Sequence, residues 1–86
     1  MLKVFECHLV PGGDPSTILS EDALRETQAQ VMTLAEARAV GLQGVPDPPV
    51  GEEICLIAVA ARDAKWIQRS VEQSDAVKGF NVHDAG

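Results

Sequence analysis

The chain lacks tyrosine, and one Trp and two Phe make up the aromatic 3% of its 86 residues. Basic residues are also scarce: 7 stand against 13 acidic residues, which gives a formal net charge of −6. Binding to the phosphate backbone needs a basic surface, so this balance argues against a nucleic-acid-binding protein. The apolar share of 45% is ordinary for a folded domain and too high for a disordered chain.

Long apolar runs are missing as well. The longest, 54–61, has the length of a strand and falls far short of the ~18 residues of a membrane span. The N-terminus is charged early and lacks the apolar run and cleavage site of a signal peptide. Only two cysteines, Cys7 and Cys55, are present, both in apolar stretches, so there is no disulfide framework. We therefore expect a cytoplasmic protein with no membrane partner.

The acidic residues are concentrated in one part of the chain. The segment 14–53 holds eight acidic and two basic residues, which accounts for the whole net charge. Such a segment is typical of a solvated surface. A weaker alternative is that it mimics nucleic acid and binds a nucleic-acid-binding protein.

The pattern of apolar residues predicts a single small α+β domain over residues 1–86. Apolar and polar residues alternate in the first strand, and the apolar central strand is followed by an amphipathic helix. The expected elements are a strand at 2–10, a helix at 20–40, a short strand near 42–45, a strand at 54–61, a helix at 64–74 and a strand at 76–83. This βαββαβ order predicts a ferredoxin-like sandwich, with two helices on one face of a four-stranded antiparallel sheet.

A capping box leaves an alternative open for the first helix. Thr33 and Glu36 have the spacing at which each side chain binds the other's backbone amide at a helix start. In this interpretation, residues 26–32 form a strand and a short helix follows at 33–41.

A histidine and a carboxylate share one face of the first strand. Glu6 and His8 are two positions apart, and the last strand of the predicted fold would bring Asn81 and His83 to the same side. A carboxylate beside a histidine is suited to proton transfer. The simpler interpretation is a dimer interface in which Leu2 and Val4 pack against a second copy, with Glu6 and His8 at its polar rim.

The second predicted helix carries a basic stripe. Arg62, Lys65 and Arg69 fall at i, i+3 and i+7, with Trp66 beside them. This surface is suited to an anionic ligand or an acidic partner, although a solvated helix face has the same pattern.

Motifs for metal and cofactor binding are missing from the sequence. Adjacent residues on a strand point to opposite faces, so Cys7 and His8 cannot share an ion, and no paired-ligand or phosphate-loop pattern occurs. We therefore expect neither metal nor cofactor, and a homodimeric interaction or ligand-binding module with a protein or small-molecule partner. The alternative is a cofactor-free dimeric enzyme that uses Glu6 and His8.

Overall fold

The structure, a computed structural model, describes residues 1–42 and 45–85. Two 3₁₀ turns, η1 (Pro15–Thr17) and η2 (Ala61–Asp63), precede the first and last helices. The helices and strands in chain order are β1 (Leu2–Leu9), α1 (Glu21–Thr27), β2 (Gln30–Thr33), α2 (Leu34–Ala39), β3 (Ile54–Ala60), α3 (Ala64–Gln73) and β4 (Val77–Ala85).

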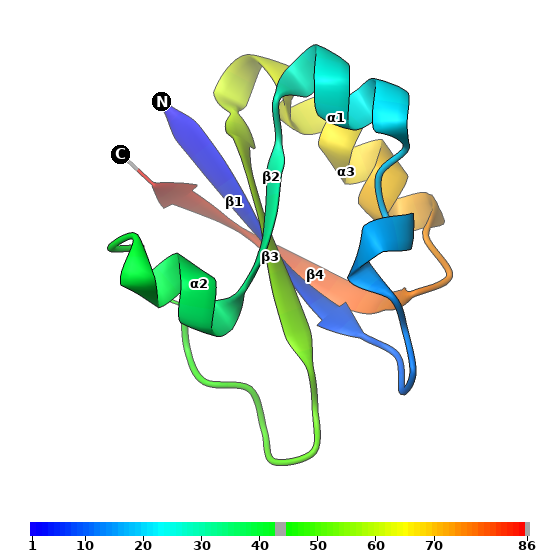
Figure 1. Ribbon diagram of the computed structural model, residues 1–86, viewed down its shortest axis with the longest axis vertical. Coiled ribbons are helices and arrows are strands. Elements are labelled where there is room, and N and C mark those ends of the chain that lie inside the picture. The colour runs from blue at the N-terminus through cyan, green and yellow to red at the C-terminus, as the bar shows by residue number, and fades with distance from the viewer. Residues whose placement is uncertain (43–44, 86) are drawn as a thin grey trace.

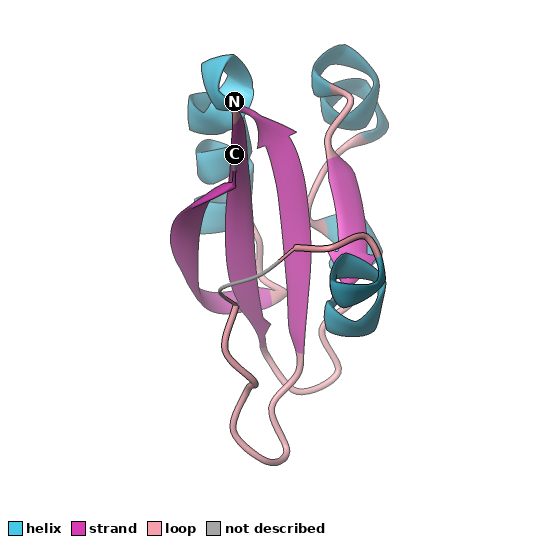
Figure 2. Ribbon diagram, turned by 90° about the vertical axis from the view of Figure 1, so that its left-hand side faces the viewer, coloured by secondary structure: helices cyan, strands magenta, loops and turns pink. Residues whose placement is uncertain are grey.

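The strands form an antiparallel sheet of four strands in the order β2-β3-β1-β4, seen side by side in Figure 2. Strand β1 pairs with β3 on one side and β4 on the other, so β3 and β4 run parallel with β1 between them. Strands β1 and β2 flank β3 in the same way. Two crossovers, through α1 and through α3, thus interleave, and the predicted ferredoxin-like α+β fold is confirmed.

Both faces of the sheet are covered, but by different helices. Figure 1 shows α1 and α3 on one side of the sheet and α2 on the other. The larger core lies under α1 and α3, where Phe5 and Ile57 of the sheet meet Ile67 of α3. On the other side, Ala37 of α2 belongs to a smaller buried cluster. Because β3 is apolar at every position, it can be buried on both faces at once.

The single helix expected over 20–40 is wrong, and the strand-then-helix alternative is confirmed with narrower bounds. Gln28 has a left-handed backbone (φ 55°), and its N–H donates to the carbonyl of Leu24, which ends α1. Thr33 then begins α2 with a complete capping box: its hydroxyl accepts from the Glu36 amide, and the Glu36 carboxylate accepts from the Thr33 amide. Helix propensity over 20–40 is overridden by these two local signals.

Strand β2 occupies the sheet edge that was expected for a strand near 42–45. Leu42 and Val45 belong to no strand, and Gln43 and Gly44 lie outside the described residues. The sandwich also carries a third helix, α2, on the face that was expected to be open. Within residues 1–42 and 45–85, no helix is both long and apolar enough to cross a bilayer.

Candidate functional site

Glu6 is a buried carboxylate near the middle of β1, on the face of the sheet that α2 partly covers. In the sheet register it lies opposite Leu56 of β3 and Asn81 of β4. Only 3% of its surface is exposed. A charged group buried to this degree needs hydrogen-bond partners. Without them, removing the carboxylate from water costs on the order of several kcal/mol, even after the protein around it relaxes.

Two histidines supply those partners. His8 Nε2 lies 2.6 Å from Glu6 Oε2, and His83 Nε2 lies 2.8 Å from Glu6 Oε1. Each oxygen of the Glu6 carboxylate is therefore hydrogen-bonded to a different imidazole. His8 shares the face of Glu6 because strand side chains alternate with a period of two. His83 joins them through the register of β1 with β4, where it is paired with Val4. Because an ionised carboxylate can only accept, both histidines carry a proton on Nε2.

These contacts decide the ionisation of Glu6. Burial works to raise the pKa of Glu6, and the hydrogen bonds from His83, His8 and Asn81 outweigh it, so that pKa lies below its ordinary value. Glu6 is therefore an anion at neutral pH.

A second carboxylate lies on the outer side of His8. His8 Nδ1 is 3.9 Å from Glu52 Oε2, and Glu52 in turn pairs with Lys78. The Lys78 ammonium holds the pKa of Glu52 below its usual range. His8 therefore lies between two carboxylates, with Glu6 on its Nε2 side and Glu52 on its Nδ1 side.

The predicted residues of this group come together as expected from the sequence. His8 and His83 each contact Glu6, and Asn81 lies on the same face, although it is largely exposed. Val4, which was expected to help form a dimer interface on this face, is instead buried against α2. Among the described residues there is no cluster of three or more His, Cys, Asp or Glu side chains able to hold a metal ion.

The basic stripe lies on the opposite side of the sheet. Arg62 belongs to η2, before α3 begins, and it pairs with Asp63 at 3.6 Å. Lys65, Trp66 and Arg69 are exposed on α3, and Trp66 retains 44% of its accessible surface. The stripe therefore belongs to a surface separate from the one that holds Glu6.

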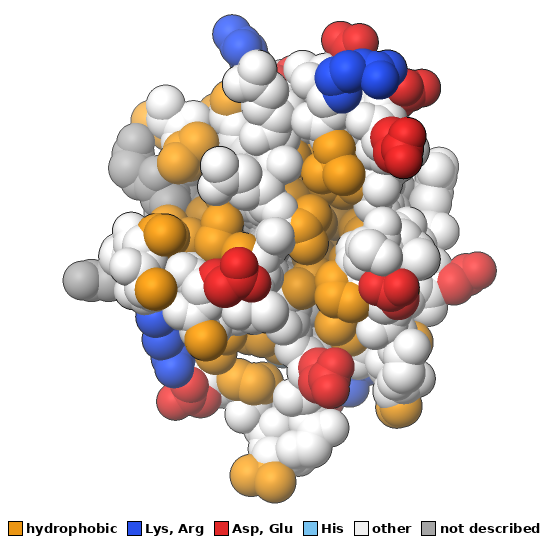
Figure 3. Space-filling model, in the orientation of Figure 1, with side chains coloured by type: hydrophobic (Ala, Val, Ile, Leu, Met, Phe, Trp, Pro, Cys, Tyr) orange, Lys and Arg blue, Asp and Glu red, His pale blue; other side chains and the backbone are white. Residues whose placement is uncertain are grey.

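Three of the eight acidic residues in the segment 14–53 form ion pairs with a lysine or an arginine. Asp22 pairs with Arg25, and Asp47 pairs with Arg38, each at 2.5 Å. Figure 3 shows acidic side chains as separate groups around one face of the molecule. This distribution is that of a solvated surface with local ion pairs.

Sequence reasoning missed a large cavity, which we call the apolar cleft. It has a volume of about 700 Å³ and lies between η1, β2, the start of α2 and the start of β3. Figure 3 shows the apolar side chains gathered in this hollow. The residues that line it are Leu9, Pro15, Ser16, Leu19, Leu24, Val31, Met32, Thr33, Leu34, Glu36, Pro48, Glu53, Ile54 and Cys55.

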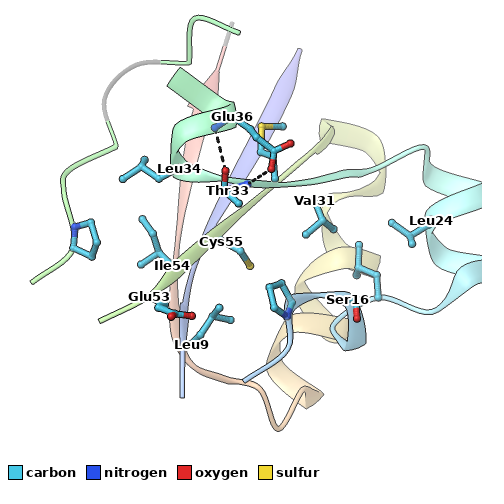
Figure 4. Close-up of a pocket in the computed structure, with 14 residues that line it drawn as sticks. Leu9, Ser16, Leu24, Val31, Thr33, Leu34, Glu36, Glu53, Ile54 and Cys55 are labelled. Atoms are coloured by element: carbon cyan, nitrogen blue, oxygen red, sulfur yellow. Dashed lines mark hydrogen bonds between the residues drawn. The ribbon is translucent and has the colours of Figure 1, made fainter. Parts of the chain in front are cut away.

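The cleft exists because β2 is short. Strand β2 pairs with β3 only from Ala58 to Cys55, and its chain then turns into α2 at Thr33. Ile54 and the residues before it are left without a neighbour on that edge, so a hollow opens around the end of β2. Figure 4 shows Val31 and Leu24 on one side of this hollow and Leu9 and Ile54 on the other. The proline-rich segment was the one sequence signal near it, since Pro48 lies in the wall.

No family model matches the chain, and no curated protein matches it.

Proposed function

We propose that the protein is a small ligand-binding module, and that the apolar cleft is its site. The observation that carries this proposal is a cavity of about 700 Å³ with mostly apolar walls. Pockets for small molecules typically have about 300–1,000 Å³ and are mostly apolar with a few polar groups. The module would work in the cytoplasm, where two free cysteines such as Cys7 and Cys55 stay reduced.

Several apolar side chains in the walls are only half-buried. Leu24, Val31, Leu34 and Ile54 all keep part of their surface in contact with solvent. A ligand that covers them would gain about 25 cal/mol for each Å² of apolar surface removed from water. The gain favours an apolar ligand.

The charge of the walls limits the ligand further. Among the described residues, the charged side chains in the lining are two carboxylates, Glu36 and Glu53, and no basic side chain lines the cleft. Glu36 is engaged in the capping box, whereas Glu53 is exposed. The cleft therefore suits a neutral or amine-bearing apolar molecule and disfavours an anionic one such as a fatty acid.

Three probes with one carbon skeleton test this proposal. Octylamine, octanol and octanoate would each be titrated into the ¹⁵N-labelled protein and followed by NMR. We expect octylamine and octanol to shift the amides of Val31 and Ile54, and octanoate to bind about tenfold more weakly, a difference of about 1.4 kcal/mol. Equal binding of all three, or shifts spread over the whole surface, would count against the cleft.

A pair of matched variants tests the location. Val31→Phe would fill the cleft and weaken octylamine binding about tenfold. Val40→Phe is the same change at the position directly after α2, which is 71% exposed and outside the cleft, and it should leave binding unchanged. Circular dichroism of both variants checks that the fold is retained.

A second candidate function is favoured by the hydrogen bonds of Glu6. A histidine whose Nε2–H is held by a buried carboxylate keeps Nδ1 as its acceptor nitrogen, so His8 or His83 would take a proton from a substrate while Glu6 orients the imidazole. None of these three residues lines the apolar cleft or the smaller hollow beside Gly51. The reaction would therefore need a second copy of the chain to enclose the site.

The enzyme candidate makes two joint predictions. Leu2 and Val82 are each 43% exposed and lie on opposite faces of the sheet. Sedimentation should show a dimer that Leu2→Arg dissociates and Val82→Arg does not. Proton abstraction from a nitrobenzisoxazole, a general probe for base catalysis, should be lost in Glu6→Gln. A monomer at high micromolar concentration with no such activity would exclude this candidate.

A further inference from the structure

The two cysteines face each other across neighbouring strands. In the register of β1 with β3, Cys7 lies directly opposite Cys55. Both are free, both belong to the larger core, and they are 0% and 2% exposed. Directly opposite residues of antiparallel strands have Cα atoms about 4.5–5.5 Å apart, which is within the range of about 4.4–6.8 Å that a disulfide needs.

We propose that Cys7 and Cys55 are a redox-active dithiol that reduces small neutral or cationic disulfides entering through the apolar cleft. This activity does not depend on the ligand proposed above. It needs only the opening of the cleft and the contact between the two thiols.

Only one of the two thiols can be reached from the cleft. Cys55 lines the apolar cleft, and Cys7 does not. Figure 4 shows the sulfur of Cys55 projecting into the cleft between Val31 and Leu9. A small disulfide can therefore reach Cys55 first, while Cys7 lies behind it in the core. Glu53 at the rim would favour a cationic disulfide and repel an anionic one such as glutathione disulfide.

The two thiols are also chemically unequal. A hydrogen bond from the Cys7 thiol lowers the pKa of Cys55. The same contact with Cys55, together with burial, raises the pKa of Cys7. Because the thiolate is the nucleophile in disulfide exchange, Cys55 attacks the incoming disulfide first. Cys7 stays protonated during that step and attacks in the second step.

The reaction balances with one disulfide, RSSR. The Cys55 thiolate attacks one sulfur of RSSR, which forms a mixed disulfide at Cys55 and releases RS⁻, and this leaving group takes a proton. The Cys7 sulfur then loses its proton and attacks the Cys55 sulfur, which releases the second RSH and forms the Cys7–Cys55 disulfide. Two protein thiols are oxidised, and one disulfide is reduced to two thiols.

The order of attack can be tested with the intact protein and two variants. Each reduced protein is mixed with hydroxyethyl disulfide, quenched in acid and weighed by mass spectrometry without reductant. Wild type should lose two hydrogen atoms and retain no added group. Cys7→Ser should accumulate a mixed disulfide at Cys55, and Cys55→Ser should remain unmodified.

The entry route has its own controls. Val31→Phe should slow the reaction about tenfold because it closes the way to Cys55, whereas Val40→Phe should not. Cystamine, which is cationic, should react faster than glutathione disulfide, and Glu53→Gln should reduce that difference. Circular dichroism confirms that each variant is folded.

Some outcomes would overturn the proposal. Equal modification of Cys7→Ser and Cys55→Ser would contradict the proposed order of attack. Oxidation that occurs only in denaturant would show that the two thiols do not react in the folded protein. Both results differ from a failure of the ligand proposal, which is measured with alkyl probes that carry no sulfur.

Discussion

At the scale of single residues, Glu6 shows how one carboxylate can be stable in a protein sheet. Each of its two oxygens is hydrogen-bonded to a different histidine. In the described part of the chain, no buried side-chain nitrogen or oxygen lacks a hydrogen-bond partner. The histidines are themselves partly exposed, so water still solvates their outer edges. Glu6 is thereby buried without being isolated from solvent protons, which is the condition for proton exchange at the site.

The ionisation of Glu6 should be visible in the stability of the fold. Its pKa is below its ordinary value of about 4.3, so the anion stabilises the folded state above that pH. As pH falls from there through the lower pKa of the folded state, this contribution is lost. We expect urea unfolding to give a free energy that falls more steeply with decreasing pH in wild type than in Glu6→Gln.

An NMR titration of the Glu6 carboxyl carbon provides the direct measurement. A midpoint above the ordinary value would mean that burial outweighs the histidines, contrary to the expectation. Asp14 and Glu52 also have pKa values lowered by hydrogen bonds, and both remain in Glu6→Gln, so the difference between the two proteins isolates Glu6.

At the scale of elements, the segment 28–39 determines where the cleft lies. Gln28 ends one helix, and Thr33 begins another after only four residues of strand. Had the first helix continued, the edge of β3 would have no partner at all. The four residues of β2 pair with residues 55–58 of β3 and leave Ile54 unpaired at the start of that strand, where the apolar cleft lies.

The capping box of α2 gives a prediction at this scale. Thr33→Ala removes the hydroxyl that accepts from the Glu36 amide and should destabilise the protein by ~1 kcal/mol, the usual value for a lost N-cap. Thr33→Ser keeps the hydroxyl and should cost only a few tenths of that. Chemical denaturation of the three proteins measures the difference, and equal losses for both variants would show that the methyl group, rather than the cap, is what matters.

Local patterns predict the parts of this fold that depend on neighbouring residues. The alternation in β1, the apolar β3 and the Ile67–Val71 stripe of α3 all follow from residue periodicity, and the structure has them within two residues. The left-handed turn at Gln28 has no such signal, because glutamine is a good helix former. The choice between one helix and two therefore depended on the capping box alone.

The candidate sites also differ in how far local sequence patterns predict them. Glu6 and His8 share a strand, so their common face is a local property. His83 lies 77 residues further along, and only the fold topology suggests that it faces them. Residues from η1, β2, α2, β3 and the proline-rich segment line the apolar cleft. No local sequence pattern indicates that these distant segments come together. The cleft could be found only from the structure.

At the scale of the whole molecule, the stability of the fold depends on one helix packed across the sheet. Ile67 of α3 is fully buried against the larger core. Ile67→Ala should destabilise the protein by about 2–5 kcal/mol, because the side chain leaves a cavity that a small core cannot refill. Trp66→Ala, at the half-exposed neighbouring position, should cost less despite the larger side chain removed. Thermal unfolding of both variants tests this order.

The central place of β1 affects how the chain is made. It leaves the ribosome before both of its partners, β3 and β4, the last of which follows about 70 residues later. At about 5–20 residues per second, the nascent strand waits for several seconds with its apolar positions uncovered. Lys3, Glu6 and His8 interrupt those positions, and charged or polar residues within an apolar strand oppose aggregation. The charged and polar side chains of β1 thus also protect the strand during its synthesis.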